Sequence, residues 1–472
     1  MSLTLEAVCA EVSKKVTPSD EERKCILDLA ERLKDRVMEA TADAGIKARV
    51  RVEGSVAKNT WLSEEPDIDI FVCVPTTIPR EEFGTRCLKI ARKATEGFKQ
   101  VERFAEHPYL ESKVDDTIVN IVPCYQVEQG EWISATDRTP FHTDYIKARL
   151  NEDVCTEIRL LKQFMKGVGV YGAEIKIGGF SGYLCELLVL NCDSFIQVLD
   201  SFADWKGRRI IDYEGFYEGK EEDLDTIFEE PLVVVDPVDQ GRNVAAAVRQ
   251  ERLNEFVVAA RAFLKNPDRR FFYPPEIVAL STQELINALE THGSKIVFVR
   301  FGKADAVPDV LWGQLYKSQR SLNKMLQQHD FNIIRDSVWG DEETLNVFIF
   351  EIEKRSLPLI RRHLGPPIGK REECEKFLRK HSGAPHTISG PRVERGRWVV
   401  EIKREHRDVV DLLTERLRDG GRRIGVADLV AQAISKGFKV SVNEEILEPY
   451  SSNPEFARFL TEYFKGKPTW LQ

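Results

Sequence analysis

The chain has 472 residues, 42% of them hydrophobic and 31% charged, which suits a protein of about three domains with well-formed cores. Its net charge of −9 excludes a generally cationic nucleic-acid coat, so any RNA-binding surface must be a local basic patch. The nine cysteines are scattered and include no Cys-x-x-Cys pair, which argues against structural zinc and for reduced thiols in a cytoplasmic protein. We find no signal peptide and no apolar run near the ~18 residues of a membrane span, so we expect no membrane partner.

The first 150 residues show alternating helical and strand-like patterns. A helix begins after Ser19, because acidic residues follow it and favour the positive end of the helix dipole. The elements that we expect next are the end of that helix near Gly45, a strand over 47–53, a strand ending at Val74, a helix over 80–97, and extended segments over 101–104 and 118–122, joined by a turn at Asp115-Asp116-Thr117. This order predicts a small mixed α/β domain.

Residues 154–266 are mostly helical in pattern, and a boundary follows at Pro267. We expect helices around 158–165 and 183–191, a short buried strand over 232–235, later strands over 295–301, 346–353 and 397–403, and later helices over 312–329, 372–381 and 409–418. The predicted fold class is therefore α+β multidomain. We place a mixed α/β domain at 1–150, a helical middle domain at 151–268 and an α+β C-terminal region at 269–472.

Two aspartates open the strand that ends at Val74. Residues two apart on a strand point to the same face, so Asp67 and Asp69 present their carboxylates together, roughly 6 to 7 Å apart along the backbone. Like charges this close repel each other, which makes sense if a divalent cation lies between them.

A second polar feature precedes the aspartates. Gly54-Ser55 predicts a turn whose backbone N–H groups face an anion, and Lys58 adds a positive charge. Carboxylates that bind metal beside a phosphate-binding turn indicate a nucleoside-triphosphate site.

These motifs resemble those of a known family. GSVAKNTW (54–61) and PDIDIF (66–71) are similar to segments of the polymerase-β-like nucleotidyltransferases, specifically the archaeal-type (class I) CCA-adding enzymes, which build and repair tRNA 3′ ends. Five further segments match in order: RTPFH (138–142), RLLKQF (159–164), YGAE (171–174), GGFSGYLCELL (178–188) and DPVDxxRNVAA (236–246). The resemblance covers about the first 250 residues, and the C-terminal third is similar only in length and composition.

The resemblance implies a polymerase-β-like palm, a helical neck and a tRNA-binding body and tail. It implies two Mg²⁺ ions at Asp67, Asp69 and the position of Asn120, and transfer from CTP and ATP to tRNA. The residues that it assigns to the nucleotide are Gly54 and Ser55 in the turn, Lys58, His142, Lys162 and Tyr171, with Arg242 selecting ATP and CTP over other nucleotides. The family usually has Arg where Lys58 stands. In GGFSGYLCELL we expect packing residues and no catalytic role.

Asn120 departs from the family, which has a third carboxylate at this position, on the strand leading into Val122-Pro123-Cys124-Tyr125. An amide oxygen can approach Mg²⁺ but carries no negative charge and cannot take a proton. We expect Asp116 not to replace it, because it lies four residues upstream on the same face, roughly 13 Å along an extended strand. The sequence therefore predicts impaired catalysis.

The span 361–439 carries 19 Lys/Arg against 11 Asp/Glu, and Arg422-Arg423 lies within it. This excess in an acidic protein favours an RNA-backbone surface. The leading function is thus template-independent CCA addition to tRNA.

The alternatives are a poly(A) or other terminal ribonucleotidyltransferase, a catalytically inactive tRNA-binding variant and a small-molecule nucleotidyltransferase. The chain's length and its basic C-terminal region weaken the last of these. The oligomeric state stays open, a homodimer included.

Overall fold

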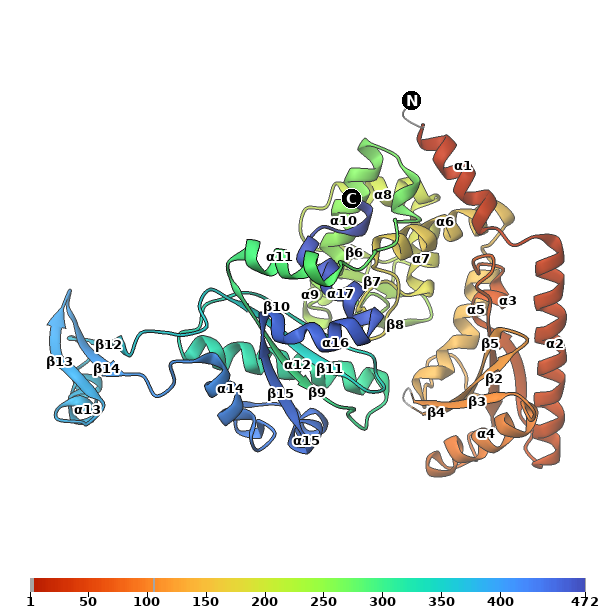
Figure 1. Ribbon diagram of the computed structural model, residues 1–472. Helices are drawn as coiled ribbons and strands as arrows, with labels where there is room; N and C mark the ends of the chain where they lie inside the picture. Colours follow the sequence, from red (N-terminus) through yellow and green to blue (C-terminus); the bar gives the residue numbers. More distant parts are fainter. Residues whose placement is uncertain (1–3, 105–106, 472) are drawn as a thin grey trace. The chain divides into compact units, whose positions relative to one another are not determined.

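The computed structural model describes residues 4–104 and 107–471 (Figure 1). It divides into two compact units, one made of Met1–Glu276 with Pro468–Gln472 and the other of Ile277–Lys467. Both units combine helices and sheets, which confirms the predicted α+β multidomain class.

A five-stranded mixed sheet forms the first part of the first unit, in the order β1-β2-β5-β4-β3. Its strands are β1 (Arg49–Glu53), β2 (Asp67–Val74), β3 (Lys99–Phe104), β4 (Pro108–Val114) and β5 (Thr117–Tyr125). Strands β2 and β5 are parallel, and the other pairs are antiparallel. Helices α2 (Asp20–Asp43) and α4 (Arg80–Ala94) cover one face of this sheet (Figure 1). Their apolar side chains, Leu33 and Phe83 among them, share one core with Ile70 of β2.

Strand β4 was not predicted from the sequence. The turn at Asp115 and Asp116 joins β4 to β5, whereas the sequence pattern placed it between the segments 101–104 and 118–122. Every second residue of β4 from Leu110 to Val114 points inward, but the central one is Ser112, whose hydroxyl donates to the carbonyl of Lys99 at 3.0 Å. Because this inward-facing residue is a polar serine, the sequence lacks the alternation of apolar and polar residues that predicts a strand.

The second part of the first unit is mainly helical. Its helices are α1 (Leu5–Val16), α5 (Thr139–Lys147), α6 (Glu152–Val168), α7 (Gly182–Cys192), α8 (Phe195–Ala203), α9 (Glu221–Ile227) and α10 (Gln250–Lys265), with short 3₁₀ turns at Ala135–Arg138, Arg269–Phe271 and Thr469–Leu471. A small sheet joins β6 (Arg209–Ile211), β7 (Leu232–Asp236) and β8 (Asp239–Asn243). The shared core combines valines and leucines with a group of phenylalanines, and Trp470 stacks on Phe271 at 5.2 Å.

Within the described residues, no single helix is long and apolar enough to cross a membrane. Helices α7 and α8 meet the length and composition criteria only as a pair bent by 89°, and most of their apolar side chains are buried in the core.

The second unit contains two sheets. The larger one has the order β10-β11-β9-β15 and consists of β9 (Lys295–Phe301), β10 (Ile333–Gly340), β11 (Asn346–Ile352) and β15 (Phe438–Val442). The smaller one has the order β12-β14-β13 and consists of β12 (Ile360–Pro367), β13 (Thr387–Glu394) and β14 (Arg397–Lys403). The helices are α11 (Thr282–His292), α12 (Pro308–Gln328), α13 (Arg371–His381), α14 (Val409–Leu417), α15 (Asp428–Lys436), α16 (Leu447–Ser452) and α17 (Pro454–Lys465), with 3₁₀ turns at Arg422–Ile424 and Asn443–Ile446.

Alternate residues of β9 and β11 pack into two separate cores. Val297 and Phe348 belong to one core and Phe298 and Ile349 to the other, so the larger sheet is covered on both faces. The strands predicted over 295–301 and 397–403 are confirmed to the residue, because both runs are apolar or alternate regularly.

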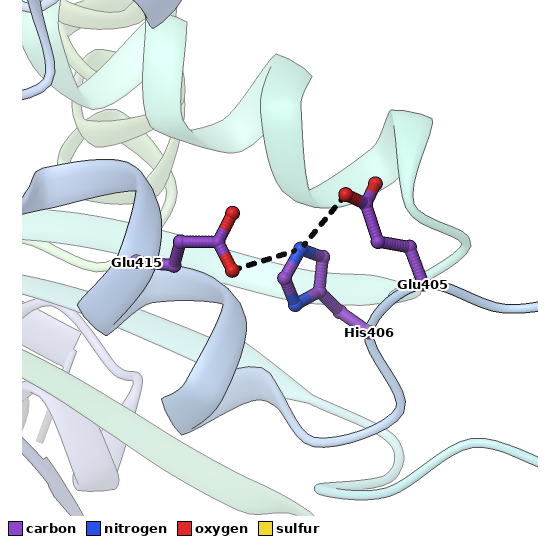
Figure 2. A group of neighbouring side chains, drawn as sticks. All are labelled: Glu405, His406 and Glu415. Atoms are coloured by element: carbon purple, nitrogen blue, oxygen red, sulfur yellow. Dashed lines mark ion pairs between the residues drawn. The ribbon is translucent and has the colours of Figure 1, made fainter.

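Ion pairs fix part of the basic region at the end of β14. Arg361 and Arg404 both contact Asp330. Figure 2 shows His406 between two carboxylates, its Nε2 atom 3.6 Å from Glu415 and 4.0 Å from Glu405. The contact with Glu415 attaches the segment after β14 to α14, and the pairs with Asp330 attach β12 and this segment to the turn after α12.

Candidate active site

A cavity of about 330 Å³ opens between the face of the first sheet that α2 and α4 leave uncovered and the helices α5, α6 and α7. Nine of the ten predicted site residues line it: Gly54, Ser55, Lys58, Asp67, Asp69, Asn120, His142, Lys162 and Tyr171. Arg242 does not line it. A larger cavity of about 750 Å³ beside β1 and α5 contains none of the ten.

The polar residues of the first sheet occupy neighbouring strands. The parallel register of β2 and β5 sets Asp69 beside Asn120, and Asn120 Nδ2 donates to Asp69 Oδ1 at 3.0 Å. Burial, aided by the charge of Asp67, raises the pKa of the Asp69 carboxyl to about 6. Burial also raises the pKa of Asp67. The site thus holds two crowded carboxylates whose ionised forms are both disfavoured.

Asp116 does not lie on the strand that carries Asn120, so its predicted placement on the same face was wrong. It belongs to the turn before β5, has a φ of 67° and is exposed. Its carboxylate pairs with Lys113 at 2.7 Å. The register also reveals Glu111 of β4 opposite Asn120, a carboxylate that the sequence analysis missed. Arg103 holds it through two hydrogen bonds of 3.0 and 2.9 Å.

Gly54-Ser55 does not form the predicted turn. It starts the short helix α3 (Gly54–Lys58), which follows β1 directly. Gly54 has a φ of 69°, and a Cβ atom there would overlap the carboxylate of Asp69. Only glycine therefore lets α3 begin against β2, and this contact brings Ser55 and Lys58 to the cavity.

Two lysines meet at one buried carboxylate. Lys58 Nζ lies 2.5 Å from Glu186 Oε2, and Lys162 Nζ lies 3.2 Å from Glu186 Oε1. Thr60 donates its hydroxyl to Glu186 Oε1 at 2.7 Å. Burial raises the pKa of Glu186, but the charges of Lys58 and Lys162 outweigh it and hold the pKa below its usual value. The sequence analysis missed Glu186 because it treated 178–188 as a packing segment; the available signal was a single acidic residue in an apolar helix.

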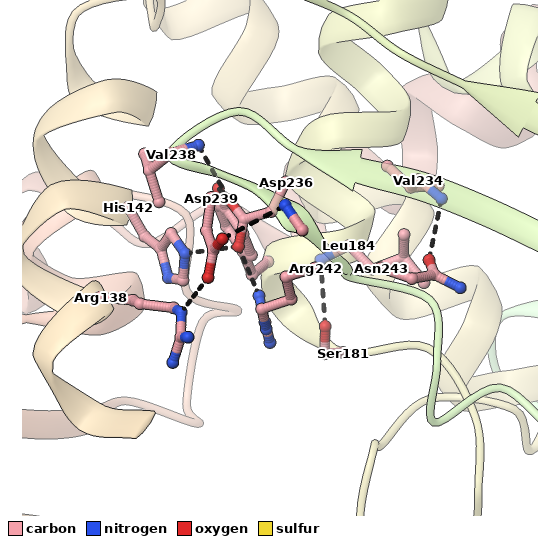
Figure 3. A network of polar contacts seen from close by, with 12 residues as sticks. Arg138, His142, Ser181, Leu184, Val234, Asp236, Val238, Asp239, Arg242 and Asn243 are labelled. Atoms are coloured by element: carbon pink, nitrogen blue, oxygen red, sulfur yellow. Dashed lines mark hydrogen bonds and ion pairs between the residues drawn. The ribbon is translucent and has the colours of Figure 1, made fainter. Parts of the chain in front are cut away.

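Asp236 at the end of β7 accepts hydrogen bonds from three side chains and from the backbone N–H of Val238. Figure 3 shows two of these side chains, His142 and Arg242, beside it. His142 Nε2 lies 2.9 Å from Asp236, Arg242 Nη1 2.6 Å and the Tyr183 hydroxyl 3.2 Å. The Tyr183 ring stacks on His142, with the ring centroids 4.1 Å apart. Tyr183 therefore contacts the site, whereas the sequence analysis expected only packing. Burial lowers the pKa of His142 despite the neighbouring carboxylate, which favours a neutral ring that donates from Nε2. Arg242 lies on β8 and is linked to the cavity through Asp236, which also holds His142.

Tyr171 lies in the segment between α6 and α7, close to the start of α7. A Cβ atom at Gly182 would come within 3.0 Å of the Tyr171 hydroxyl and 3.6 Å of Lys162 Nζ. Burial raises the pKa of the Tyr171 phenol well above its usual value, so it is a neutral donor beside the lysine pair.

Comparisons with known proteins cover nearly the whole chain. Residues 30–142 match the nucleotidyltransferase domain, residues 156–273 match the second domain of tRNA nucleotidyltransferase, and residues 292–443 match the C-terminal domain of the CCA-adding enzyme. The CCA-adding enzyme of Methanothermobacter thermautotrophicus is 37% identical over 96% of each chain. Those of Methanosarcina barkeri and Pyrobaculum neutrophilum are 38% and 39% identical over 92% and 88% of this chain and 93% and 94% of the relatives.

The chain belongs to the CCA-adding enzyme family. This confirms the resemblance found in the first 250 residues. The match of residues 292–443 corrects the expectation that the C-terminal third is similar to the family only in length and composition.

Nucleotidyltransferases of this family use divalent metal ions. The donor set at the start of β2 fits such an ion, because carboxylate and amide oxygens are the ligands that hard divalent cations prefer. The raised pKa values of Asp67 and Asp69 agree with this, since a nearby cation would favour both ionised forms. Chemically, the cavity can hold a cation on its sheet side and a phosphate chain on its lysine side.

Proposed function

We propose that this member of the CCA-adding enzyme family adds CCA to tRNA 3′ ends, using CTP, ATP and Mg²⁺. The observation that carries this proposal is that the aspartates of β2 and the lysines of α3 and α6 line one cavity. A triphosphate that binds there is held between positive side chains and the metal-binding carboxylates.

Each residue of the cavity has a chemical role in this proposal. Asp67, Asp69 and the side-chain oxygen of Asn120 would hold Mg²⁺. When bound, Mg²⁺ lowers the pKa of an attacking 3′-hydroxyl and offsets the charge of the leaving pyrophosphate. Lys58 and Lys162 bind phosphate oxygens as charged donors.

The remaining residues position the nucleotide. Ser55 donates its hydroxyl to the triphosphate, and Gly54 allows the close approach of α3. Tyr171 donates at a fixed direction because its side chain is largely buried, and His142, whose Nε2 hydrogen is used by Asp236, presents Nδ1 as an acceptor. Arg242, held by Asp236, helps to select ATP and CTP.

Asn120 limits the rate in this proposal. Its amide donates to Asp69, so a metal ion would meet a neutral oxygen where a third carboxylate would add charge. The chain would bind both substrates and transfer nucleotides slowly.

We also propose a three-part organisation, with a palm at 1–150, a neck at 151–268 and a body and tail at 269–472 that bind tRNA through the basic span 361–439. The three family matches support three parts, although the second match runs to residue 273 and the first compact unit to residue 276, both past the proposed boundary at 268. The scattered cysteines support a cytoplasmic location, and a homodimer is a state to test by sedimentation.

An incorporation assay on tRNA that lacks its 3′ end tests the function. With CTP and ATP supplied, we expect ordered addition that halts after CCA, at a low rate, and no product from an Asp69→Asn variant. Open-ended adenylation would support a poly(A)-type transferase instead. Normal tRNA binding without incorporation at high Mg²⁺ would support an inactive tRNA-binding protein.

A further inference from the structure

Glu186 is the shared partner of two lysines in the nucleotide cavity. Lys58, Thr60, Lys162 and Glu186 are each at least 92% buried, and they come from three separate segments of the first unit. Besides Glu186, Lys162 Nζ donates to the Thr60 carbonyl and hydroxyl, both at 3.1 Å. The two ammonium groups are therefore fixed in position before any nucleotide arrives.

Burying two positive charges together is unfavourable, because each ammonium group loses hydration and repels the other. Burial is the main cause of the lowered pKa of Lys162, and Lys58 adds to it, whereas Glu186 opposes both effects. Without that carboxylate, Lys162 would lose its proton more readily. With it, the cluster has two positive charges and one negative charge, which leaves a net positive charge at the cavity.

The other titratable groups near the pair do not supply a second counter-charge to Lys162. Burial raises the pKa of the Cys185 thiol to about 12 and the pKa of the Tyr171 phenol well above its usual value, so both are neutral. Asp69 of β2 is close enough for the charge of Lys58 to favour its ionised form, but no ion pair joins the two among the contacts of the described residues. His142 of α5 carries no negative charge and so cannot balance Lys58. Glu186 is thus the carboxylate on which both lysines depend.

We propose that Glu186 is a positioning residue that fixes Lys58 and Lys162, and keeps Lys162 charged, for the triphosphate of the incoming nucleotide. It acts through the lysines and does not touch the substrate. This inference rests on the proposed function, because it assumes that the cavity binds a triphosphate. Charge alone predicts the opposite effect: if Glu186 competes with phosphate for the lysines, its removal tightens binding.

The pH dependence of binding separates these two effects. Inorganic tripolyphosphate serves as the probe, since it needs no tRNA and presents the phosphate chain alone. Its affinity for the full chain is measured by calorimetry in EDTA from about pH 6 to about pH 9. We expect Glu186→Gln to bind nearly as well as the parent at the acidic end, and roughly tenfold or more weakly at the alkaline end, where Lys162 loses its proton. Titration of Asp69 and of the probe itself affects both chains alike, so the ratio of the two affinities at each pH is the quantity that tests the role of Glu186.

A milder variant covers the case in which Glu186→Gln does not fold. Thr60→Val keeps the carboxylate but removes the hydroxyl that bonds to both Glu186 and Lys162. We expect a smaller loss of affinity with the same pH trend. Asp137→Asn is the structural control, because this buried carboxylate binds the backbone N–H of Tyr125 and Ser134 and does not line the site cavity. It should lower thermal stability without a pH-dependent loss of tripolyphosphate.

The outcomes distinguish a failure of the proposed function from a failure of the positioning role of Glu186. If the parent chain binds neither tripolyphosphate nor ATP, the proposed function fails. If the parent binds and Glu186→Gln binds equally well, or more tightly, at every pH, the positioning role of Glu186 is overturned while the proposed function stands.

Discussion

Replacing Asn120 by aspartate is the most direct perturbation of the proposed metal site. The side chain of Asn120 lies 3.0 Å from Asp69 and lines the cavity, so Asn120→Asp adds a carboxylate beside the two already there without changing the size of the side chain. The structure then predicts opposite effects with and without a divalent cation.

Without metal, the variant loses the hydrogen bond to Asp69 and gains a like charge. Two carboxylates about 4 Å apart repel by about 4 kcal/mol at an effective dielectric constant of about 20, and protonation of one of them relieves part of this. We expect the free energy of unfolding in EDTA to fall by about 2 kcal/mol. With Mg²⁺, the same carboxylate becomes a third charged ligand. About 3 kcal/mol of added transition-state stabilisation corresponds to about a hundredfold increase in rate.

Single-turnover incorporation on tRNA that lacks its 3′ end measures the rate, and thermal unfolding with EDTA or Mg²⁺ measures the stability. Asn254→Asp, at an exposed position of α10, is the matched control and should change neither quantity. If Asn120→Asp is no faster than the parent and its unfolding temperature does not rise with Mg²⁺, then Asn120 lies outside the metal site and the account of reduced activity is wrong.

Two further predictions concern His142 and the basic region. Burial lowers the pKa of His142 in the folded chain below its usual value of about 6.5, so the unfolded chain takes up a proton first on acidification. The free energy of unfolding therefore falls as the pH falls below about 6.5. Urea titrations at several pH values measure this, and His142→Asn should remove this part of the parent's pH dependence. The side chains of Arg422 and Arg423 are 47% and 91% exposed. Changing both to Gln should weaken tRNA binding and reduce the slope of log affinity against log salt concentration by about 2, whereas the control Lys206→Gln in the first unit should not. An unchanged slope would show that the pair does not belong to the RNA-binding surface.

Local patterns predicted the elements whose residues follow one periodicity. The strand from Asp67 to Val74 was found to the residue, because it alternates and then stays apolar. Strand β4 was missed because Ser112 interrupts its inward-facing side, and the turn expected at Gly54 proved to be a helix start that depends on contact with Asp69. Both failures have one cause, which is that a tertiary contact replaced the local preference.

The sequence by itself determined the family, the pair of aspartates on one strand and most of the residues that line the cavity, because these are carried by short motifs in a fixed order. Only the tertiary structure decided the partners of those residues. Lys58 meets Glu186 across 128 positions of sequence, and His142 meets Asp236 across 94. Neither carboxylate belongs to a local pattern that marks it as a partner, since the charge that a buried group needs is supplied by whichever segment the fold brings beside it.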